Sequence, residues 1–184
     1  MCRMSNCCSS KVVIFVSLLC GVAAAQSAPK TPDPVPLLRV AEIHQGTMVA
    51  EESCSIVHSD GRYRSERYLR KRTVANVGFE SDSLDIREGQ VSEDALNQLL
   101  SIIGATEFRQ LKSPNLIRRI VDEDYHALQI AVFRHEQIQD LKYPNKASRK
   151  ADAAKLKPLL DWWQQLRKNP GHVVTNGQRT RCMP

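Results

Sequence analysis

The sequence has few of the patterns that carry enzyme chemistry. Its eight glycines are dispersed, which excludes a glycine-rich loop that would cradle phosphates. There is no G-x-S-x-G motif, and the five histidines occur singly, with no pair two or four residues apart. The nearest match to a zinc-protease motif, His135-Glu136, has Gln139 where the second histidine should stand. We therefore expect no catalytic residue, no metal site and no cofactor.

Long apolar runs are also missing. The longest, Val12–Ala25, is shorter than the roughly 20 residues that a membrane-spanning helix needs. A basic start, a short apolar run and small residues at its end are typical of a secretory signal peptide. We predict that residues 1–25 are this signal, cleaved between Ala25 and Gln26, with Ala28 as a second possible site. The mature chain would then have no transmembrane helix and be periplasmic or secreted.

Cysteine is scarce once the signal is removed, because only Cys54 and Cys182 remain. In an oxidising compartment these two residues are a candidate disulfide, and the alternative is two independent thiols. The signal also removes two basic residues, which leaves 24 against 20 acidic ones, a net charge of +4. This mild excess fits weak attraction to anionic surfaces, and export argues against a nucleic-acid partner.

The 159 residues that remain suit a single domain with a core of ordinary size. Residues 26–37 contain four prolines and little that is apolar, which predicts a flexible leader. Residues 169–184 are interrupted by proline and glycine, which predicts an irregular tail unless Cys182 fixes it. The domain itself is expected over residues 38–168.

Runs of β-formers and apolar alternation predict strands at 38–44, 54–58, 62–69, 84–86, 125–134 and 137–143. Asp60-Gly61 is the strongest hairpin signal. The turn is either a two-residue type I′ turn or a type I turn with a G1 bulge. These alternatives differ by one residue in register, so the sequence does not decide which side chains of the hairpin face the core.

Two longer helices are expected. Ser92 is a good N-cap for the first, which Gly104 would close. The second carries a leucine and tryptophan stripe from Leu156 to Leu166. Pro158 lies within that stripe, so the helix either begins near Lys157 or begins near Ser148 and kinks. The predicted fold is α+β, an antiparallel sheet of about five or six strands with two main helices packed on one face.

One stretch of the chain has a clear chemical bias. Its six basic residues stand beside two tyrosines, and they are Arg62, Arg64, Arg67, Arg70, Lys71 and Arg72. Arginine binds phosphate and carboxylate groups through two parallel hydrogen bonds, which makes the stretch a candidate anion-binding site. The alternative is a strand whose outer face is simply charged, which also protects an edge against aggregation.

Three short motifs carry a resemblance. They are SDGRY at Ser59–Tyr63 with Glu66 behind it, G-x-V-S at Gly89–Ser92 and LKPLLDWW at Leu156–Trp163. With these motifs, residues 38–168 resemble a group of small exported bacterial proteins of unknown function that are common in acidobacteria. The resemblance implies an extracytoplasmic domain and transfers no functional residue.

Two functions are consistent with these observations. The first is a non-enzymatic exported domain that binds or has a structural role in the cell envelope or secreted space, with an anionic envelope component or another exported protein as its partner. The alternative is a small extracytoplasmic hydrolase or metal-dependent enzyme that uses His44, His58 or Cys54. Convergence of these three side chains in a cleft would favour the enzyme.

Overall fold

The computed structural model of the chain describes residues 35–72, 79–115, 125–135, 137–169 and 171–175. These residues belong to a compact unit that spans Asp33–Pro184. The predicted cleavage site at Ala25 and Gln26 lies outside the described residues, as does Cys182.

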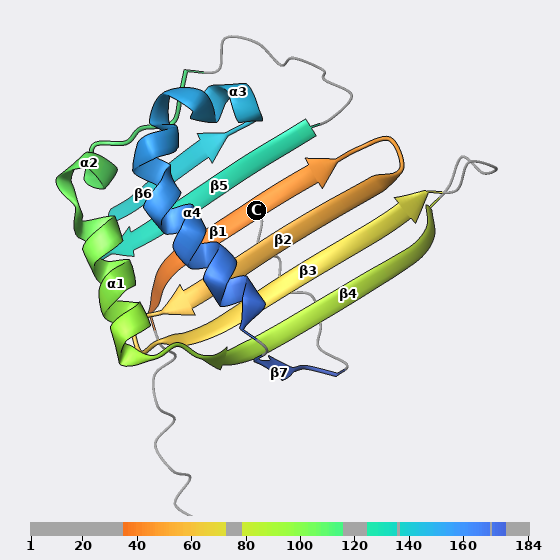
Figure 1. Cartoon of the computed structure of the whole chain (residues 1–184), viewed down its shortest axis with the longest axis horizontal. Helices are drawn as coiled ribbons and strands as arrows, with labels where there is room; N and C mark the ends of the chain where they lie inside the picture. Colours follow the sequence, from red (N-terminus) through yellow and green to blue (C-terminus); the bar gives the residue numbers. More distant parts are fainter. Residues whose placement is uncertain (1–34, 73–78, 116–124, 136, 170, 176–184) are drawn as a thin grey trace, which may run out of the picture. The chain divides into compact units, whose positions relative to one another are not determined.

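Seven antiparallel strands form one sheet (Figure 1). In chain order they are β1 (Pro36–Gln45), β2 (Val49–His58), β3 (Arg62–Arg72), β4 (Phe79–Gln90), β5 (Tyr125–Arg134), β6 (Gln137–Tyr143) and β7 (His172–Val173). Across the sheet the order is β6-β5-β1-β2-β3-β4-β7. The first four strands therefore form a meander, and the β5–β6 hairpin pairs with it through β1.

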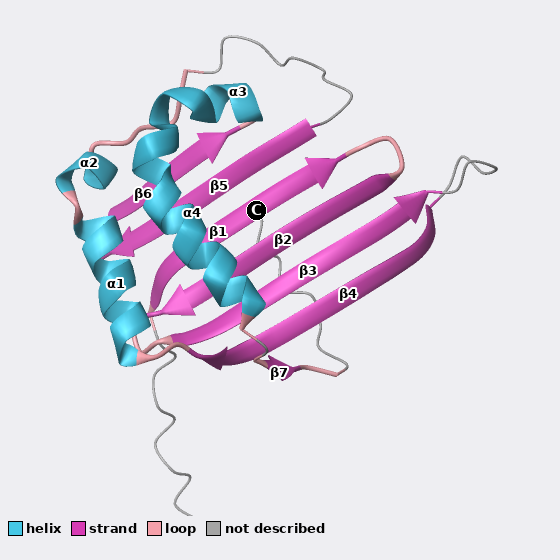
Figure 2. Cartoon of the chain, viewed as in Figure 1, coloured by secondary structure: helices cyan, strands magenta, loops and turns pink. Residues whose placement is uncertain are grey.

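The alternation of side chains along the strands decides which face of the sheet is buried. Leu38 and Val40 of β1 lie opposite Val132 and Ile130 of β5, and all four point to one face. Each is at most 1% exposed. The longer helices lie over this face, which we call the helix face, and we call the other the reverse face (Figure 2). Burial of this apolar surface is the main force that holds helices and sheet together.

Two longer and three short helical segments follow from local signals. They are α1 (Glu93–Gly104), α2 (Thr106–Arg109), α3 (Lys146–Arg149), the 3₁₀ turn η1 (Lys150–Asp152) and α4 (Ala153–Lys168). The predicted cap of α1 is confirmed, because the Ser92 side chain accepts a hydrogen bond from the backbone N–H of Ala95. Asn145 caps α3 in the same way, through the backbone N–H of Ser148.

The start of α4 lies between the two predicted positions. It begins at Ala153, directly after α3 and η1, and Pro158 lies inside it. Proline lacks a backbone N–H and so removes one hydrogen bond of the helix. The predicted stripe compensates for this loss, because Leu156, Leu159 and Trp163 are each at most 2% exposed.

The β2–β3 hairpin resolves the register that the sequence left open. Val57 pairs with Tyr63, and the Gly61 N–H donates to the carbonyl of His58 at 3.0 Å. Gly61 has a φ of 83°, whereas neither Ser59 nor Asp60 has a positive φ. A type I′ turn needs positive φ at both central residues, so this is the type I turn followed by a G1 bulge. Tyr63 and Ser65 therefore lie on the helix face.

Strand β4 is much longer than the predicted segment 84–86. Gly89, which interrupts the apolar pattern, stays within the strand opposite Tyr63. A Cβ atom at Gly89 would lie 2.8 Å from a ring carbon of Tyr63. The glycine thus makes room for a buried aromatic ring and does not end the strand.

The predicted fold of five or six strands and two main helices on one face was wrong. The structure has a single sheet of seven strands and additional short helices. The extra strand β7 has only two residues, and it lies in the tail that the sequence indicated as irregular. α2 and α3 have four residues each, which is too short to produce a helical period.

No helix in the described ranges has the length and apolar character needed to cross a membrane.

Candidate anion-binding cleft

The six basic residues singled out in the sequence do not share one surface. They all belong to β3, where alternate side chains point to opposite faces. The register puts Arg67 and Lys71 on the helix face. Arg62, Arg64 and Arg70 lie on the reverse face. The side chain of Arg72 is outside the described residues.

The reverse-face arginines are paired with acids. Arg62 Nε lies 2.6 Å from an Asp60 carboxylate oxygen. Arg64 contacts Glu66 at 2.8 Å and Glu88 at 2.6 Å. Arg70 lies 3.8 Å from Glu52. An anionic ligand would have to compete with these carboxylates.

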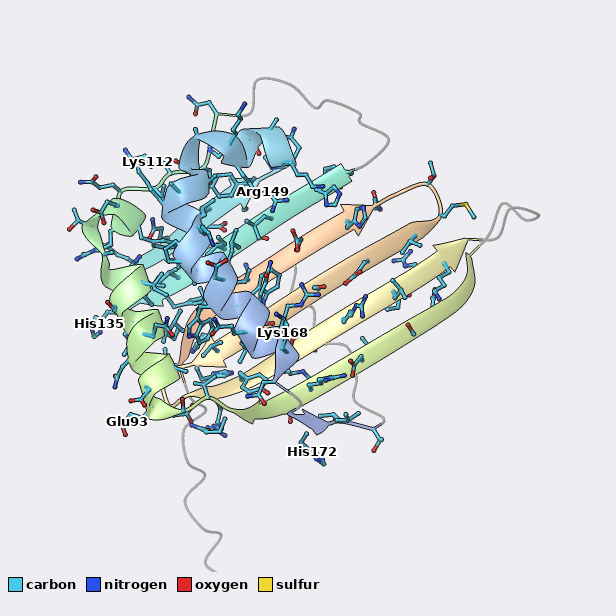
Figure 3. All side chains as sticks on the ribbon, in the orientation of Figure 1. Glu93, Lys112, His135, Arg149, Lys168 and His172 are labelled. Atoms are coloured by element: carbon cyan, nitrogen blue, oxygen red, sulfur yellow. The ribbon has the colours of Figure 1, made fainter. Side chains whose placement is uncertain are left out.

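A cleft on the helix face brings Arg67 together with cations that the sequence did not single out. It has a volume of about 360 Å³ and lies between β3, β4 and the last turns of α4. Its lining residues are Ser65, Glu66, Arg67, Asp85, Arg87, Gln164, Arg167 and Lys168. Figure 3 labels Lys168 where α4 ends above the sheet.

Glu51 of β2 is the carboxylate that organises this cleft. Arg67 donates to both of its oxygens, from Nε at 2.8 Å and from Nη2 at 3.2 Å. Arg167 reaches the same carboxylate at 3.4 Å and donates to the Ser53 hydroxyl at 3.1 Å. The hydrogen bond from Arg67 lowers the pKa of Glu51 against the opposing effect of burial. The same bond raises the pKa of Arg67, so both groups stay charged.

Trp163 fixes the end of α4 over the sheet. Its ring is 2% exposed, and its Nε1–H donates to the Ser55 hydroxyl at 2.9 Å. Ser55 in turn lies 2.9 Å from the hydroxyl of Ser65 on β3. The Arg167 guanidinium stands 5.0 Å from the centre of the Trp163 ring, a cation–π distance. The tryptophan thus positions Arg167 at the wall of the cleft.

The cleft carries more positive than negative charge. Arg67, Arg87, Arg167 and Lys168 supply four cations. Three acids oppose them, Glu66 and Asp85 in the lining and Glu51 beside it. Glu51 binds Arg67 and Arg167, and Asp85 binds Arg87 at 3.0 Å. Lys168 has no ion pair within the described part of the chain, and Glu66 belongs to the reverse-face pair with Arg64.

A second hollow, of about 330 Å³, lies beside the first turn of α1 and has no charged side chain in its lining. Gln90, Ser92, Gln165 and Asn169 provide its polar groups, and Trp162 closes it. Because it contains no cation, it offers an anion only neutral donors.

The residues proposed for an enzyme do not converge. His58 pairs with Pro36, whereas His44 lies eight residues further along β1, which is about 26 Å on an extended strand. Cys54 points to the reverse face with Ala41. His44 instead stacks on His126, with ring centres 3.8 Å apart and planes at 15°. Among the described residues, no group of three or more possible metal ligands occurs.

The disulfide between Cys54 and Cys182 stays a prediction. Cys54 is 5% exposed, and Cys182 lies outside the described residues. We expect peptide mapping of the unreduced, exported protein to recover a Cys54–Cys182 cross-linked peptide that separates on reduction. Recovery of two alkylated thiols, or of Cys54 linked to another cysteine, would contradict this pairing.

No protein-family model and no curated protein sequence matches this chain. The candidate site therefore rests on its geometry.

Proposed function

We propose that the chain is a non-enzymatic, exported binding domain that takes an anionic group of an envelope component into the cleft between β3, β4 and α4. The observation that carries this proposal is the gathering of four cations, Arg67, Arg87, Arg167 and Lys168, in the lining of one cleft. Export to the periplasm or the secreted space is part of the same proposal, and it rests on the predicted signal peptide.

The chemistry of the lining supports a ligand with a single anionic group. Arginine forks match the two oxygens of a carboxylate or the oxygens of a phosphate or sulfate. Asp85 would repel a densely charged polyanion, but it can accept hydrogen bonds from hydroxyl groups. Gln164 offers a further donor and acceptor. A carboxylate or phosphate on a hydroxyl-bearing molecule fits this set.

The test is a titration of the purified domain with three probes: glucuronate, inorganic phosphate, and phosphatidylglycerol vesicles with phosphatidylcholine vesicles as the neutral control. We expect Arg87→Gln to weaken binding about tenfold, because it removes a cation and leaves Asp85 unpaired in the cleft. Lys168→Gln should weaken binding less, because a lysine contributes one point charge. Binding should also weaken as salt is raised.

Two variants serve as controls. Lys157→Gln changes an exposed lysine of the same helix that pairs with Asp161. Arg62→Gln changes an exposed arginine of the reverse face. Both should bind like the unaltered chain. If no probe binds, or if Arg87→Gln and Arg62→Gln lose the same affinity, the cleft is not the site.

A further inference from the structure

A band of buried side chains crosses the reverse face of the sheet, at right angles to the strands. Ile86 of β4 lies opposite Glu66 of β3, which lies opposite Cys54 of β2. Cys54 in turn lies opposite Ala41 of β1. All four side chains are at most 5% exposed, although the longer helices cover the other face of the sheet (Figure 2). The band therefore needs a cover that these helices do not provide.

The buried band is one row of side chains wide. Leu84 lies two residues before Ile86 on the same face of β4, and it is 39% exposed. Glu88 lies two residues after Ile86, and its side chain is 46% exposed. Side chains on one face of a strand recur about every 7 Å. The covered strip thus has the width of a single extended segment that crosses the strands.

The loops of the domain do not reach along this band. Residues 73–78 join β3 to β4, and such a loop can extend about 12 Å before it must return, whereas Glu66 lies about 20 Å back along β3 from Arg72. Residues 116–124 lead into β5, which lies four strands, or about 19 Å, from the strand of Ile86. Half of their extended length is about 16 Å. Of the longer undescribed segments in the compact unit Asp33–Pro184, this leaves residues 176–184.

These residues leave the described part of the chain at the first member of the band. The backbone N–H of Val174 donates to the carbonyl of Ile86 at 2.9 Å. Cys54 lies two strands further across the sheet, about 10 Å away. The seven residues 176–182 span up to about 23 Å when extended, so that Cys182 can reach Cys54.

An arginine beside the band also indicates that main chain lies over it. Arg39 lies on the reverse face, two residues before Ala41 on β1. Its Nε–H is buried and has no hydrogen-bond partner among the described residues. An extended segment across the strands brings backbone carbonyl groups, which are acceptors for such a donor.

We infer that residues 176–184 lie across the reverse face along the buried band, and that a Cys54–Cys182 disulfide holds them there. The segment covers Ile86 and Ala41 and shields the Glu66–Arg64 ion pair from water. The inference goes beyond the proposed function, because the anion-binding cleft lies on the other face. Formation of the bond takes two electrons and two protons from the two thiols. A small disulfide such as oxidised glutathione accepts them and is reduced to two thiols.

Photo-cross-linking in the oxidised full chain identifies what covers the band. The photoreactive residue p-benzoylphenylalanine is introduced in place of Gln178 or Met183, one position in each variant. We expect position 178 to cross-link to β3 or β4 and position 183 to cross-link to β1 or β2, since the segment runs from Ile86 toward Cys54. The control position is the exposed Ser101 of α1, on the helix face, which should cross-link to neither pair.

Hydroxyl-radical footprinting measures the cover and its disulfide without a bulky probe. In the oxidised chain we expect oxidation of Leu84 and protection of Ile86 in the same peptide. In Cys182→Ser the oxidation of Ile86 should rise on the order of tenfold, toward the level of Leu84. Met183→Ser is the matched control, because it changes the next residue and keeps both cysteines. Continued protection of Leu38 on the helix face shows that each variant is folded.

The two measurements separate the parts of the inference. Cross-links from position 178 to the helix face, or to a second copy of the chain, would overturn the placement of residues 176–184. Cross-links as expected, together with an Ile86 that stays protected in Cys182→Ser, would overturn the disulfide as the attachment and keep the placement. Neither readout depends on anion binding, so a failure of the proposed function leaves both unchanged.

Discussion

Trp163→Ala is expected to lower the free energy of unfolding by about 3–5 kcal/mol, the range for removing a large buried aromatic side chain. The ring is 2% exposed and belongs to the core between α4 and the sheet. The variant also leaves the buried Ser55 hydroxyl without its donor from the indole. Urea unfolding followed by far-UV circular dichroism would measure the loss.

Trp163→Phe separates the contribution of apolar burial from that of the indole hydrogen bond. It keeps most of the apolar volume and removes the hydrogen bond, so we expect a smaller loss, of about 1–3 kcal/mol. In Trp163→Ala the folded protein should bind glucuronate more weakly, because Arg167 loses its aromatic support, whereas the phenyl ring of Trp163→Phe keeps part of that support. A loss of less than 1 kcal/mol in Trp163→Ala would contradict the position of this ring in the core.

Glu51→Gln is expected to tighten anion binding about tenfold at neutral pH, because it removes a carboxylate that competes for two arginines. Glutamine keeps a hydrogen-bond acceptor for Arg67, so the fold should lose only about 1 kcal/mol. Isothermal titration with glucuronate at pH 7.5 would measure the gain.

The neighbouring carboxylate provides the matched control. Glu52 points to the reverse face and lies 3.8 Å from Arg70. Glu52→Gln changes the net charge by the same amount at the next position, so it separates a local effect from a general one. Equal gains in both variants would mean that net charge, rather than the cleft, determines the affinity.

The sequence predicted several local elements correctly because short-range chemistry decides them. Serine is a preferred N-cap residue, as Ser92 is for α1, and the Leu156 to Leu166 stripe has a helical period. Asp60-Gly61 indicated the hairpin at the right place. The register of this hairpin could not be predicted from these residues, because both turn types fit them and the two turns shift the strand pairing by one residue.

The cleft could not be predicted in the same way. Its cations come from β3, β4 and the end of α4, which lie far apart in the sequence. The charge run on β3 drew attention to six residues, and the alternation of the strand distributes them over two faces. For the cations of the cleft that the sequence did not single out, the available signal was the pair Arg167-Lys168 at the end of an apolar helix. That pattern is equally typical of favourable interaction with the helix dipole.

NMR mapping of arginine side chains during a glucuronate titration tests the central claim most directly. The Nε–H signals of Arg67, Arg87 and Arg167 should move together and saturate at one affinity. Arg62, Arg64 and Arg70 on the reverse face should stay unchanged. Movement of the reverse-face signals first, or a drift of all six without saturation, would contradict an anion site in the cleft.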